Sequence, residues 1–445
     1  MLERKRRRFL VSRLKCLLKI SLIGLVLGAC QPPQNNREGP PDFTPSEKLI
    51  IQSLTGHPEL TSNPSNRWAD QPRAAHFGQY LFFDKRLSQN GKLNCASCHN
   101  PGLGWSDGKA LAQGLKTTAR NSPSLWNVSH QRWFFWDGRT DSAWAQAIQP
   151  LESLAEMGMD RVRLLHVFHQ NSDLRQGYEA LFGTLPSVTG LPSSGRPVAE
   201  QADHPLQKNW NLLSEAQKQQ VNIFLTNLTK TLEAFERRFQ TGENAFDRFA
   251  KGLRTHQPEL QNALSIEAQK GLRLFIGRAQ CVLCHTGPLF SDLEFHNTGL
   301  SALPGQAIDQ GRYLGIPALM SDAFNGLGPY TDLASKEDAW NDKLIYLQRK
   351  ATNQGEFKTP GLREISRTAP YMHDGRFKTL EEVVRFYSQP LSEPPATGRR
   401  EDTIQVLDLK PEEIKYLVAF LESLTGPEPP LDWVGQPKSA VYSQP

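Results

Sequence analysis

Apolar side chains recur with helical spacing over residues 221–239, and this pattern predicts the clearest helix of the chain. The apolar positions are Val221, Phe224, Leu225, Leu228, Leu232, Phe235 and Phe239. They fall at i, i+3, i+4, i+7, i+11, i+14 and i+18, so they form one stripe on a helix with 3.6 residues per turn. A shorter stripe of Ala268, Leu272 and Phe275 follows Ser265, a residue suited to cap a helix.

Capping residues predict two more helices near the end of the chain. Thr379 is followed three residues later by Glu382, the spacing of a capping box, so we expect a helix over Leu380–Tyr387. A final helix should begin at Pro411 and stop at Gly426-Pro427, because proline suits a first turn and the glycine–proline pair ends a helix. The chain is therefore predicted to be mainly α-helical.

Three other segments show little periodicity. Gln31–Pro45 is a proline-rich polar stretch of the kind that forms a tether, and structured sequence should start near Ser46. Leu185–Pro205 is rich in proline, glycine and serine and is predicted to be a surface loop. Leu300–Asn353 is expected to be a long insertion with little regular structure.

Charge is unevenly distributed along the chain of 445 residues. The whole sequence has 51 Lys and Arg against 46 Asp and Glu, a formal net charge of +5. Residues 1–30 hold eight of the basic residues and one acid, so the remainder has 43 basic against 45 acidic residues. This balance gives no reason to expect nucleic acid or an anionic membrane surface as a partner.

Residues 1–30 have the pattern of a targeting segment. Arg4–Arg8 is basic, and the apolar stretch Ile20–Val26 is too short to span a bilayer comfortably. Leu27-Gly28-Ala29-Cys30 resembles a bacterial lipobox, so we expect cleavage before Cys30 and a lipid on that cysteine. The mature protein would then be periplasmic and held to the membrane by the lipid alone. The alternative is an uncleaved N-terminal anchor.

A five-residue cysteine motif occurs twice, as Cys95-Ala96-Ser97-Cys98-His99 and as Cys281-Val282-Leu283-Cys284-His285. C-x-x-C-H is the attachment site of a c-type haem, in which both thiols bond the haem and the histidine ligates its iron. The sequence therefore predicts two covalently bound haem c groups. A zinc site or a disulfide is the alternative for each cysteine pair. Cys16 and Cys30 are the only other cysteines, and both belong to the targeting segment.

A second repeat follows each cysteine motif. Ser122-Pro123-Ser124-Leu125 precedes Trp136-Asp137-Gly138-Arg139, and Thr359-Pro360-Gly361-Leu362 precedes His373-Asp374-Gly375-Arg376, with Pro and Asp 14 residues apart in both copies. We predict two cytochrome c-like haem domains related by internal duplication, over residues 46–250 and 251–425, with residues 426–445 as a tail. Two unrelated domains that share Asp-Gly-Arg are the alternative.

The repeat also predicts a difference between the two haem sites. His99 and His285 each take one axial position of an iron, and the other position decides whether the iron binds a small molecule. Tyr387 lies 13 residues past Asp374 on the inward face of its helix, whereas Pro150, which has no donor atom, lies 13 past Asp137. We therefore expect Tyr387 to close the second haem and the first haem to be open and reactive. Met372 is the rival ligand.

An open haem that cleaves peroxide needs a group that moves a proton between the two oxygens. Glu156 lies six residues after Pro150 and Gln146 lies four before it, so both can reach the pocket above the first iron if Pro150 lies over it. A partly desolvated Glu156 could shuttle that proton. By position alone, Glu156 could also be a solvated loop acid.

With these motifs the chain resembles the bacterial di-haem cytochrome c peroxidase and MauG family over roughly residues 70–425. Beyond the cysteine motifs, the matching segments are Arg120-Asn121-Ser122-Pro123, Phe135-Trp136-Asp137-Gly138-Arg139, Glu156-Met157-Gly158 and Ala369-Pro370-Tyr371-Met372-His373-Asp374-Gly375-Arg376. The resemblance implies that Glu156 is the distal acid–base with Gln146 beside it. It also implies that Trp136 relays electrons between the haems, with plain packing as the alternative.

The resemblance further implies a calcium site and shows two departures from the peroxidase pattern. Asn121, Thr368 and Pro370 match the family's calcium position between the domains, where caps and turns are the alternative. Peroxidases of the family usually carry Met where Tyr387 stands, and MauG-like members carry Tyr. Peroxidases often have a His that blocks the first haem, and Gln113 stands at that place here.

These observations predict a periplasmic di-haem c-type peroxidase. It would reduce hydrogen peroxide to water with electrons relayed from the second haem and an external donor such as a c-type cytochrome. A MauG-like oxidation of a protein or peptide substrate is the alternative that the two departures favour. A di-haem cytochrome that only transfers electrons is an alternative of another class.

Overall fold

The computed structural model describes residues 39–56, 58–198, 201–389 and 394–443. The predicted targeting segment, Cys30 and the first part of the predicted tether lie outside these residues. Residues 40–445 form one compact unit. Within the described part of the chain, no helix is both long enough and apolar enough to cross a membrane.

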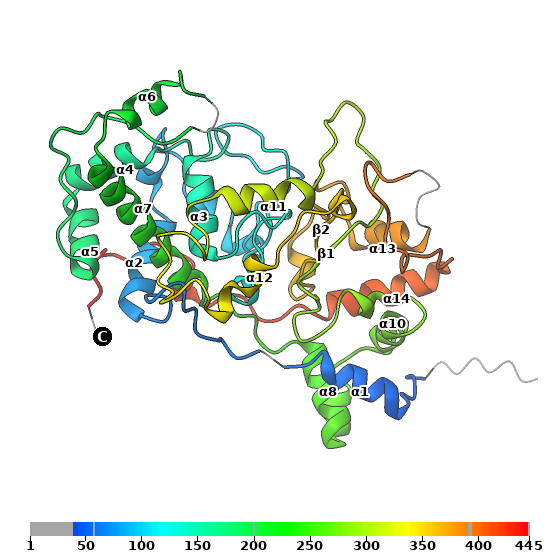
Figure 1. The fold of residues 1–445 in the computed structure, drawn as a ribbon. Coiled ribbons are helices and arrows are strands. Elements are labelled where there is room, and N and C mark those ends of the chain that lie inside the picture. The colour runs from blue at the N-terminus through cyan, green and yellow to red at the C-terminus, as the bar shows by residue number, and fades with distance from the viewer. Residues whose placement is uncertain (1–38, 57, 199–200, 390–393, 444–445) are drawn as a thin grey trace, which may run out of the picture. The chain divides into compact units, whose positions relative to one another are not determined.

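The fold is mainly helical, as the sequence predicts (Figure 1). The helices are α1 Pro45–Ser53, α2 Pro72–Phe82, α3 Ala143–Glu152, α4 Arg161–Gln170, α5 Ser172–Phe182, α6 Pro205–Asn211, α7 Glu215–Glu236, α8 Ala245–Thr255, α9 Pro258–Gln261, α10 Ile266–Ile276, α11 Arg312–Ser321, α12 Asp342–Ile345, α13 Leu380–Ser388 and α14 Pro411–Glu422. Two short strands, β1 Phe295–His296 and β2 Phe357–Lys358, pair antiparallel with Phe295 opposite Lys358.

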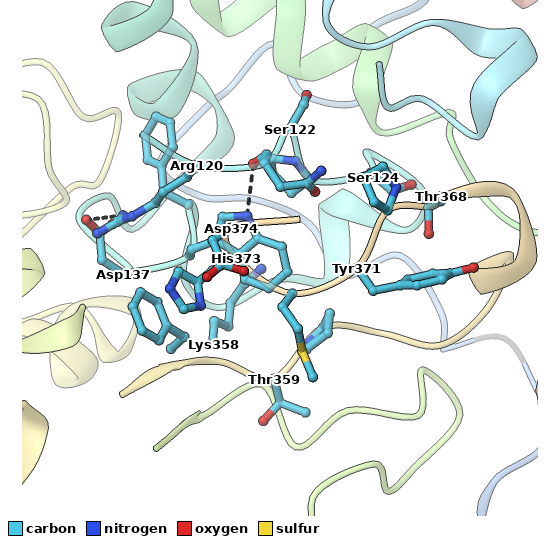
Figure 2. Close-up of a pocket in the computed structure, with 18 of the residues that line it drawn as sticks. Arg120, Ser122, Ser124, Asp137, Lys358, Thr359, Thr368, Tyr371, His373 and Asp374 are labelled. Atoms are coloured by element: carbon cyan, nitrogen blue, oxygen red, sulfur yellow. Dashed lines mark hydrogen bonds and ion pairs between the residues drawn. The ribbon is translucent and has the colours of Figure 1, made fainter. Parts of the chain in front are cut away.

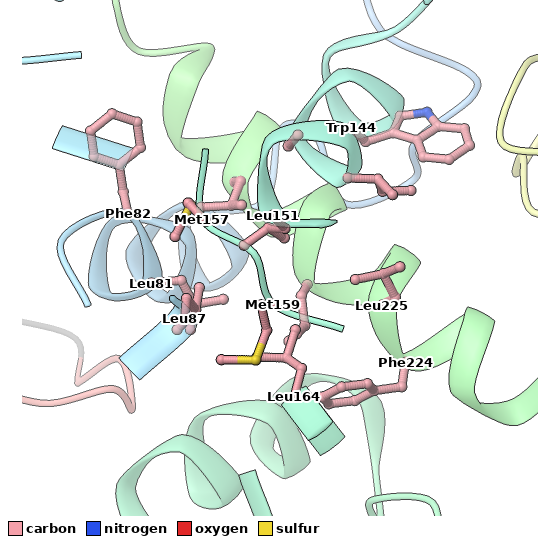
Figure 3. Close-up of a cluster of buried hydrophobic side chains, with 14 of the residues drawn as sticks. Leu81, Phe82, Leu87, Trp144, Leu151, Met157, Met159, Leu164, Phe224 and Leu225 are labelled. Atoms are coloured by element: carbon pink, nitrogen blue, oxygen red, sulfur yellow. The ribbon is translucent and has the colours of Figure 1, made fainter. Parts of the chain in front are cut away.

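Helix α7 is the centre of the first hydrophobic cluster and confirms the apolar stripe. Ser214 caps it through a capping box, and the stripe residues are buried. Phe239 is also fully buried although the helix ends at Glu236. Figure 3 shows part of the cluster, where Leu81 of α2 and Leu151 of α3 belong to the same core as Leu225 of α7.

A second hydrophobic cluster is built on α10 and α14, with α8 and α13 beside them. Ser265 caps α10 by accepting the Ala268 backbone N–H, as predicted. The predicted capping box of Thr379 and Glu382 opens α13. Helix α14 begins at Pro411 as predicted but ends at Glu422, before Gly426. Leu424 and Thr425 donate their backbone N–H groups only three residues back, to the Leu421 and Glu422 carbonyls, so the chain leaves the helix in turns.

One helix crossing in each cluster depends on a glycine. Gly78 of α2 lies against the carbonyl of Thr231 on α7, and Gly271 of α10 lies against the carbonyl of Tyr416 on α14. A Cβ at either glycine would overlap that carbonyl oxygen. The absence of a side chain therefore lets two helix backbones approach closely at both places.

Local conformations recur along the chain at a constant offset. Residues with positive φ stand 237 positions apart in three pairs, namely Asn127 with Glu364, Phe135 with Met372, and Gly138 with Gly375. Helices α3 and α13 begin at the same offset, and so do the isolated antiparallel bridges Phe134–Thr140 and Tyr371–Phe377. The duplication and the domain boundary near residue 250 stay predictions.

The segment Leu300–Asn353 has more regular structure than expected. It contains the ten-residue helix α11, whose run of mostly apolar residues gives no polar–apolar stripe that a sequence pattern could detect. Arg312, at the start of α11, is buried between the rings of Trp133 and Phe295, with 4.3 Å and 4.1 Å from its guanidinium carbon to the ring centres. The insertion is thus packed against the first half of the chain.

The Gly271→Ala variant should be less stable by about 2 kcal/mol. Overpacking costs up to about 3 kcal/mol, and the better helix propensity of alanine returns about 1 kcal/mol. Thermal unfolding of the holoprotein measures the difference. Gly435→Ala is the control, because no atom lies within 4 Å of its added Cβ. Equal stability of Gly271→Ala and wild type would contradict the close helix crossing.

Candidate haem-binding site

The two cysteine motifs line one continuous cavity of about 1180 Å³. In each motif the first cysteine opens a short 3₁₀ turn, over Cys95–Ser97 and Cys281–Leu283. The histidine backbone N–H then donates to the carbonyl of the first cysteine, at 2.9 Å in both copies. The thiols and the imidazole of each motif are therefore presented to the same space.

Each motif histidine is held by one ring nitrogen. His99 Nδ1 lies 3.1 Å from the carbonyl oxygen of Trp105, and His285 Nδ1 lies 2.9 Å from that of Phe290. Burial lowers the pKa of both imidazoles, which favours the neutral ring. Because a carbonyl can only accept, the proton belongs on Nδ1, and the Nε2 lone pair is left for a metal.

The cysteines fit haem better than zinc or a disulfide. All four are free thiols, and burial raises the pKa of Cys98 to about 11 and that of Cys281 to about 12. Among the described residues, the one cluster of acids, histidines and cysteines tight enough for a metal ion includes Cys284 alone of the four. A structural zinc site would need four converging ligands, usually with thiolates.

The predicted peroxide-handling residues line the same cavity as the first motif. Gln146 and Pro150 lie one turn apart on α3, and both line the cavity with His99. Glu156, in the turn after α3, is half-buried and lines the cavity too. Its backbone carbonyl accepts the Leu115 N–H at 2.9 Å, which fixes the turn to the loop that follows the motif.

Gln113, which the sequence resemblance matches to a blocking histidine, is held within that loop. Its side-chain Nε2 donates to Thr117 Oγ1 at 2.9 Å, and the same two residues form a backbone bridge. Gln113 is not among the described residues that line the cavity. The amide therefore points to its own loop.

At the second motif, Tyr387 of α13 lines the cavity on the same face as Leu380, Val383 and Val384, as predicted. Burial raises the pKa of its phenol, and the nearby thiols of Cys281 and Cys284 act in the same direction. This electrostatic influence means that the phenol lies close to the second motif. Met372 also lines the cavity, so the rival ligand is present as well.

The segment between the two motifs is a hydrogen-bonded junction. Trp136 Nε1 donates to the Asn121 carbonyl at 3.0 Å, and the Asn121 N–H donates to the His373 carbonyl at 2.8 Å. His373 occupies the place of Trp136 in the second repeat and stacks on Phe357, with ring centres 3.6 Å apart. Figure 2 shows His373 between Asp137 and Tyr371.

The predicted calcium residues also lie along this cavity. Asn121, Thr368 and Pro370 are all among its lining residues. The Asn121 side-chain amide donates to the Lys109 carbonyl at 2.8 Å, and the Thr368 hydroxyl donates to the Ile365 carbonyl at 3.2 Å. Both groups still have oxygen lone pairs, and calcium at this place stays a prediction.

Sequence reasoning missed two charged groups at the junction. Arg120 forms an ion pair with Asp137 at 2.6 Å (Figure 2). It forms a second ion pair with Asp309 at 2.7 Å, and Asp309 belongs to the predicted insertion. Lys358 reaches the cavity, donates to Gln131 Oε1 at 2.6 Å, and has its pKa lowered to about 8 by burial. A cation there suits the carboxylate groups of a haem. The motif Arg120-Asn121-Ser122-Pro123 could have indicated Arg120, whereas no sequence signal indicated Lys358.

Comparisons with known proteins agree on one family. The sequence pattern of the di-haem cytochrome c peroxidases matches residues 72–255. Cytochrome-c peroxidase IdrP2 of Pseudomonas sp. (strain SCT) is 33% identical, over 83% of this chain and 86% of that protein. Methylamine utilization protein MauG of Methylorubrum extorquens is 29% identical, over 86% of each. The crystal structure of a MauG-like protein associated with microbial copper homeostasis matches with a TM-score of 0.59, at 24% identity, over 85% of this chain and 98% of that one.

Denatured protein should keep two haems. The thioether bonds survive denaturation, so haem staining should remain on a denaturing gel, and the mass should exceed that of the polypeptide by about two haems. The Cys95→Ala/Cys98→Ala variant should keep one haem, and the matched Cys281→Ala/Cys284→Ala variant the other. Wild-type protein with one haem or none would contradict this assignment.

Proposed function

The chain belongs to the di-haem cytochrome c peroxidase and MauG family, and on this premise we propose that it is a peroxidase with two haem c groups. It would reduce hydrogen peroxide with two electrons and two protons to two waters. The observation that carries the proposal is the single cavity, which both cysteine motifs line together with Gln146, Pro150, Glu156 and Tyr387. The electrons would come from an external donor such as a c-type cytochrome.

The residues of the first motif have separate tasks in this proposal. Cys95, Cys98 and His99 would hold the haem, which supplies the redox chemistry when it is bound. Pro150 offers no donor atom and so keeps the opposite face accessible. The Glu156 carboxylate would take the proton from one peroxide oxygen and give it to the other, which becomes water. The Gln146 amide can orient the peroxide by a hydrogen bond.

The rest of the chain would serve electron transfer. Cys281, Cys284 and His285 would hold the second haem, with Tyr387 as its other axial ligand. Trp136 would relay electrons between the sites, which its cavity position and its bond to Asn121 support. We propose that the two sites belong to duplicated domains, 46–250 and 251–425. The recurrence of local conformations at an offset of 237 supports this division.

A MauG-like oxidation of a protein or peptide is the second candidate function. Two observations favour it, the tyrosine on α13 and the Gln113 amide held to Thr117 instead of pointing at the first site. From the sequence and the resemblance we also propose a lipid anchor at Cys30, a periplasmic location, and a calcium at Asn121, Thr368 and Pro370. The remaining alternative, a di-haem cytochrome that only transfers electrons, would consume no peroxide.

Glu156→Gln should slow the reaction with peroxide by roughly 10²–10⁴-fold while both haem spectra stay unchanged, since an amide cannot shuttle the proton. Stopped-flow mixing with peroxide measures the rate. Glu215→Gln, a change of an exposed acid at the start of α7, is the matched control. A near-normal rate in Glu156→Gln would move the acid–base role to another residue.

The oxidised protein should show one high-spin and one low-spin haem and should react with peroxide without prior reduction. Pro150 leaves the first site open, Gln113 is held away, and an anionic phenolate oxygen favours the oxidised state of the second site. Electron paramagnetic resonance of wild type and Tyr387→Phe tests the ligand. A sulfur–iron band that survives in Tyr387→Phe and disappears in Met372→Leu would assign the ligand to Met372. An oxidised protein that is inert until half-reduced would contradict the open first site.

A further inference from the structure

Glu236 is a buried acid at the first motif for which the proposed reaction has no task. It is the last residue of α7 and lines the same cavity as Cys95 and His99. Only 5% of the residue is exposed to solvent, and its Oε2 atom has no hydrogen-bond partner among the described residues. An unpartnered carboxyl oxygen at this depth is costly, so it calls for a physical explanation.

The surroundings of Glu236 disfavour its charged form. Glu233 lies one turn earlier on α7 and is held by the side-chain amides of Asn63 and Asn66, the latter at 3.1 Å. Burial and the Glu233 carboxylate raise the pKa of Glu236 to about 8. The C-terminal end of a helix also repels a negative charge.

Few other charged groups face Glu236. The Cys95 thiol on the 3₁₀ turn Cys95–Ser97 is a further titratable group whose charge is coupled to Glu236, and a thioether there would carry no charge. Arg237, the next residue, is turned to Asp70 Oδ1 at 2.6 Å. Near neutral pH the Glu236 carboxyl is therefore mostly protonated and close to its point of titration.

We infer that Glu236 takes up one proton when the first haem is reduced and releases it when that haem is oxidised. This inference rests on the proposed attachment of a haem at Cys95 and Cys98. When one electron leaves the site, to peroxide or to another oxidant, the local positive charge grows and the O–H bond of Glu236 ionises, with the proton going to water. When one electron returns, the carboxylate takes a proton back.

Coulomb's law and thermodynamic linkage explain why the proton of Glu236 and the electron are coupled. Two charges interact more strongly in a buried cavity than in water, and no cation of the described residues donates to Glu236 Oε2 to weaken that effect. Linkage requires the exchange to be reciprocal, so a potential that depends on the proton implies a pKa that depends on the electron.

Redox titration of the holoprotein at a series of pH values tests the inference. The number of bound haems is determined first, and the redox state of each haem is then followed by its own spectrum. In wild type the potential of the first haem should fall across a range around pH 8, by up to about 59 mV per pH unit, the value for one proton per electron. Glu236→Gln should abolish the fall in that range and leave the second haem unchanged.

Glu233→Gln is the second variant. It removes the neighbouring charge but keeps the Glu236 carboxyl, so the fall should move to lower pH instead of disappearing. Infrared difference spectra between reduced and oxidised protein give an independent readout, because the signal of a protonated carboxyl should be present in wild type and lost in Glu236→Gln.

The outcomes separate this inference from the proposed function. A wild type with two haems and a pH-independent first potential would overturn the redox-linked proton, while the peroxidase proposal would stand. A fall that persists in Glu236→Gln would also overturn it. A wild type without haem at the first motif would refute both proposals together.

Discussion

The hydrogen bond from each motif histidine to a backbone carbonyl is the interaction on which both sites depend. The carbonyls belong to Trp105 and Phe290, and both residues have positive φ, at 59° and 54°. That conformation is strained for aromatic residues and persists only where packing enforces it. Trp105 stacks on Phe239 with ring centres 3.8 Å apart, and Phe290 lies against Phe246. The two hydrophobic clusters thus fix the acceptors that orient the two imidazoles.

Local backbone conformations recur in the two halves, and we propose that they serve different chemistry there. Helices α3 and α13 start at equivalent points of the repeat, and each faces a motif across the cavity. A proline on α3 stands where a tyrosine stands on α13. Under the proposed function, exchange of this single side chain on a recurring backbone would make one site accessible and give the other an oxygen ligand. At the junction, His373 likewise stands in the second repeat where Trp136 stands in the first. Asn121 is hydrogen-bonded to both residues.

How much the sequence could predict depends on how local each signal is. The stripe on α7, the capping box of α13 and the paired motifs depend on neighbours within a few residues, and the structure has these helices as expected. The end of α14 at Glu422 and the helix α11 were missed, because a turn can close before a glycine and an apolar run has no stripe. The pairing of Arg120 with Asp309 was out of reach, since it joins segments about 190 residues apart. So was the unpartnered oxygen of Glu236, because only the tertiary structure shows what surrounds the end of α7.

The raised pKa values of the buried acids do not conflict with their proposed tasks. Burial raises the pKa of Tyr387 and of Glu236, which favours the neutral form of both groups. A ligated iron cation acts in the opposite direction and can deprotonate a group bonded to it. The phenol of Tyr387 would be bonded directly and so would lose its proton permanently. Glu236 would feel the same charge only through space, and an acid whose pKa is about 8 needs only a modest change of field to exchange its proton near neutral pH. Under these proposals, direct bonding to the iron would make Tyr387 a ligand, whereas action through space alone would make Glu236 a proton store.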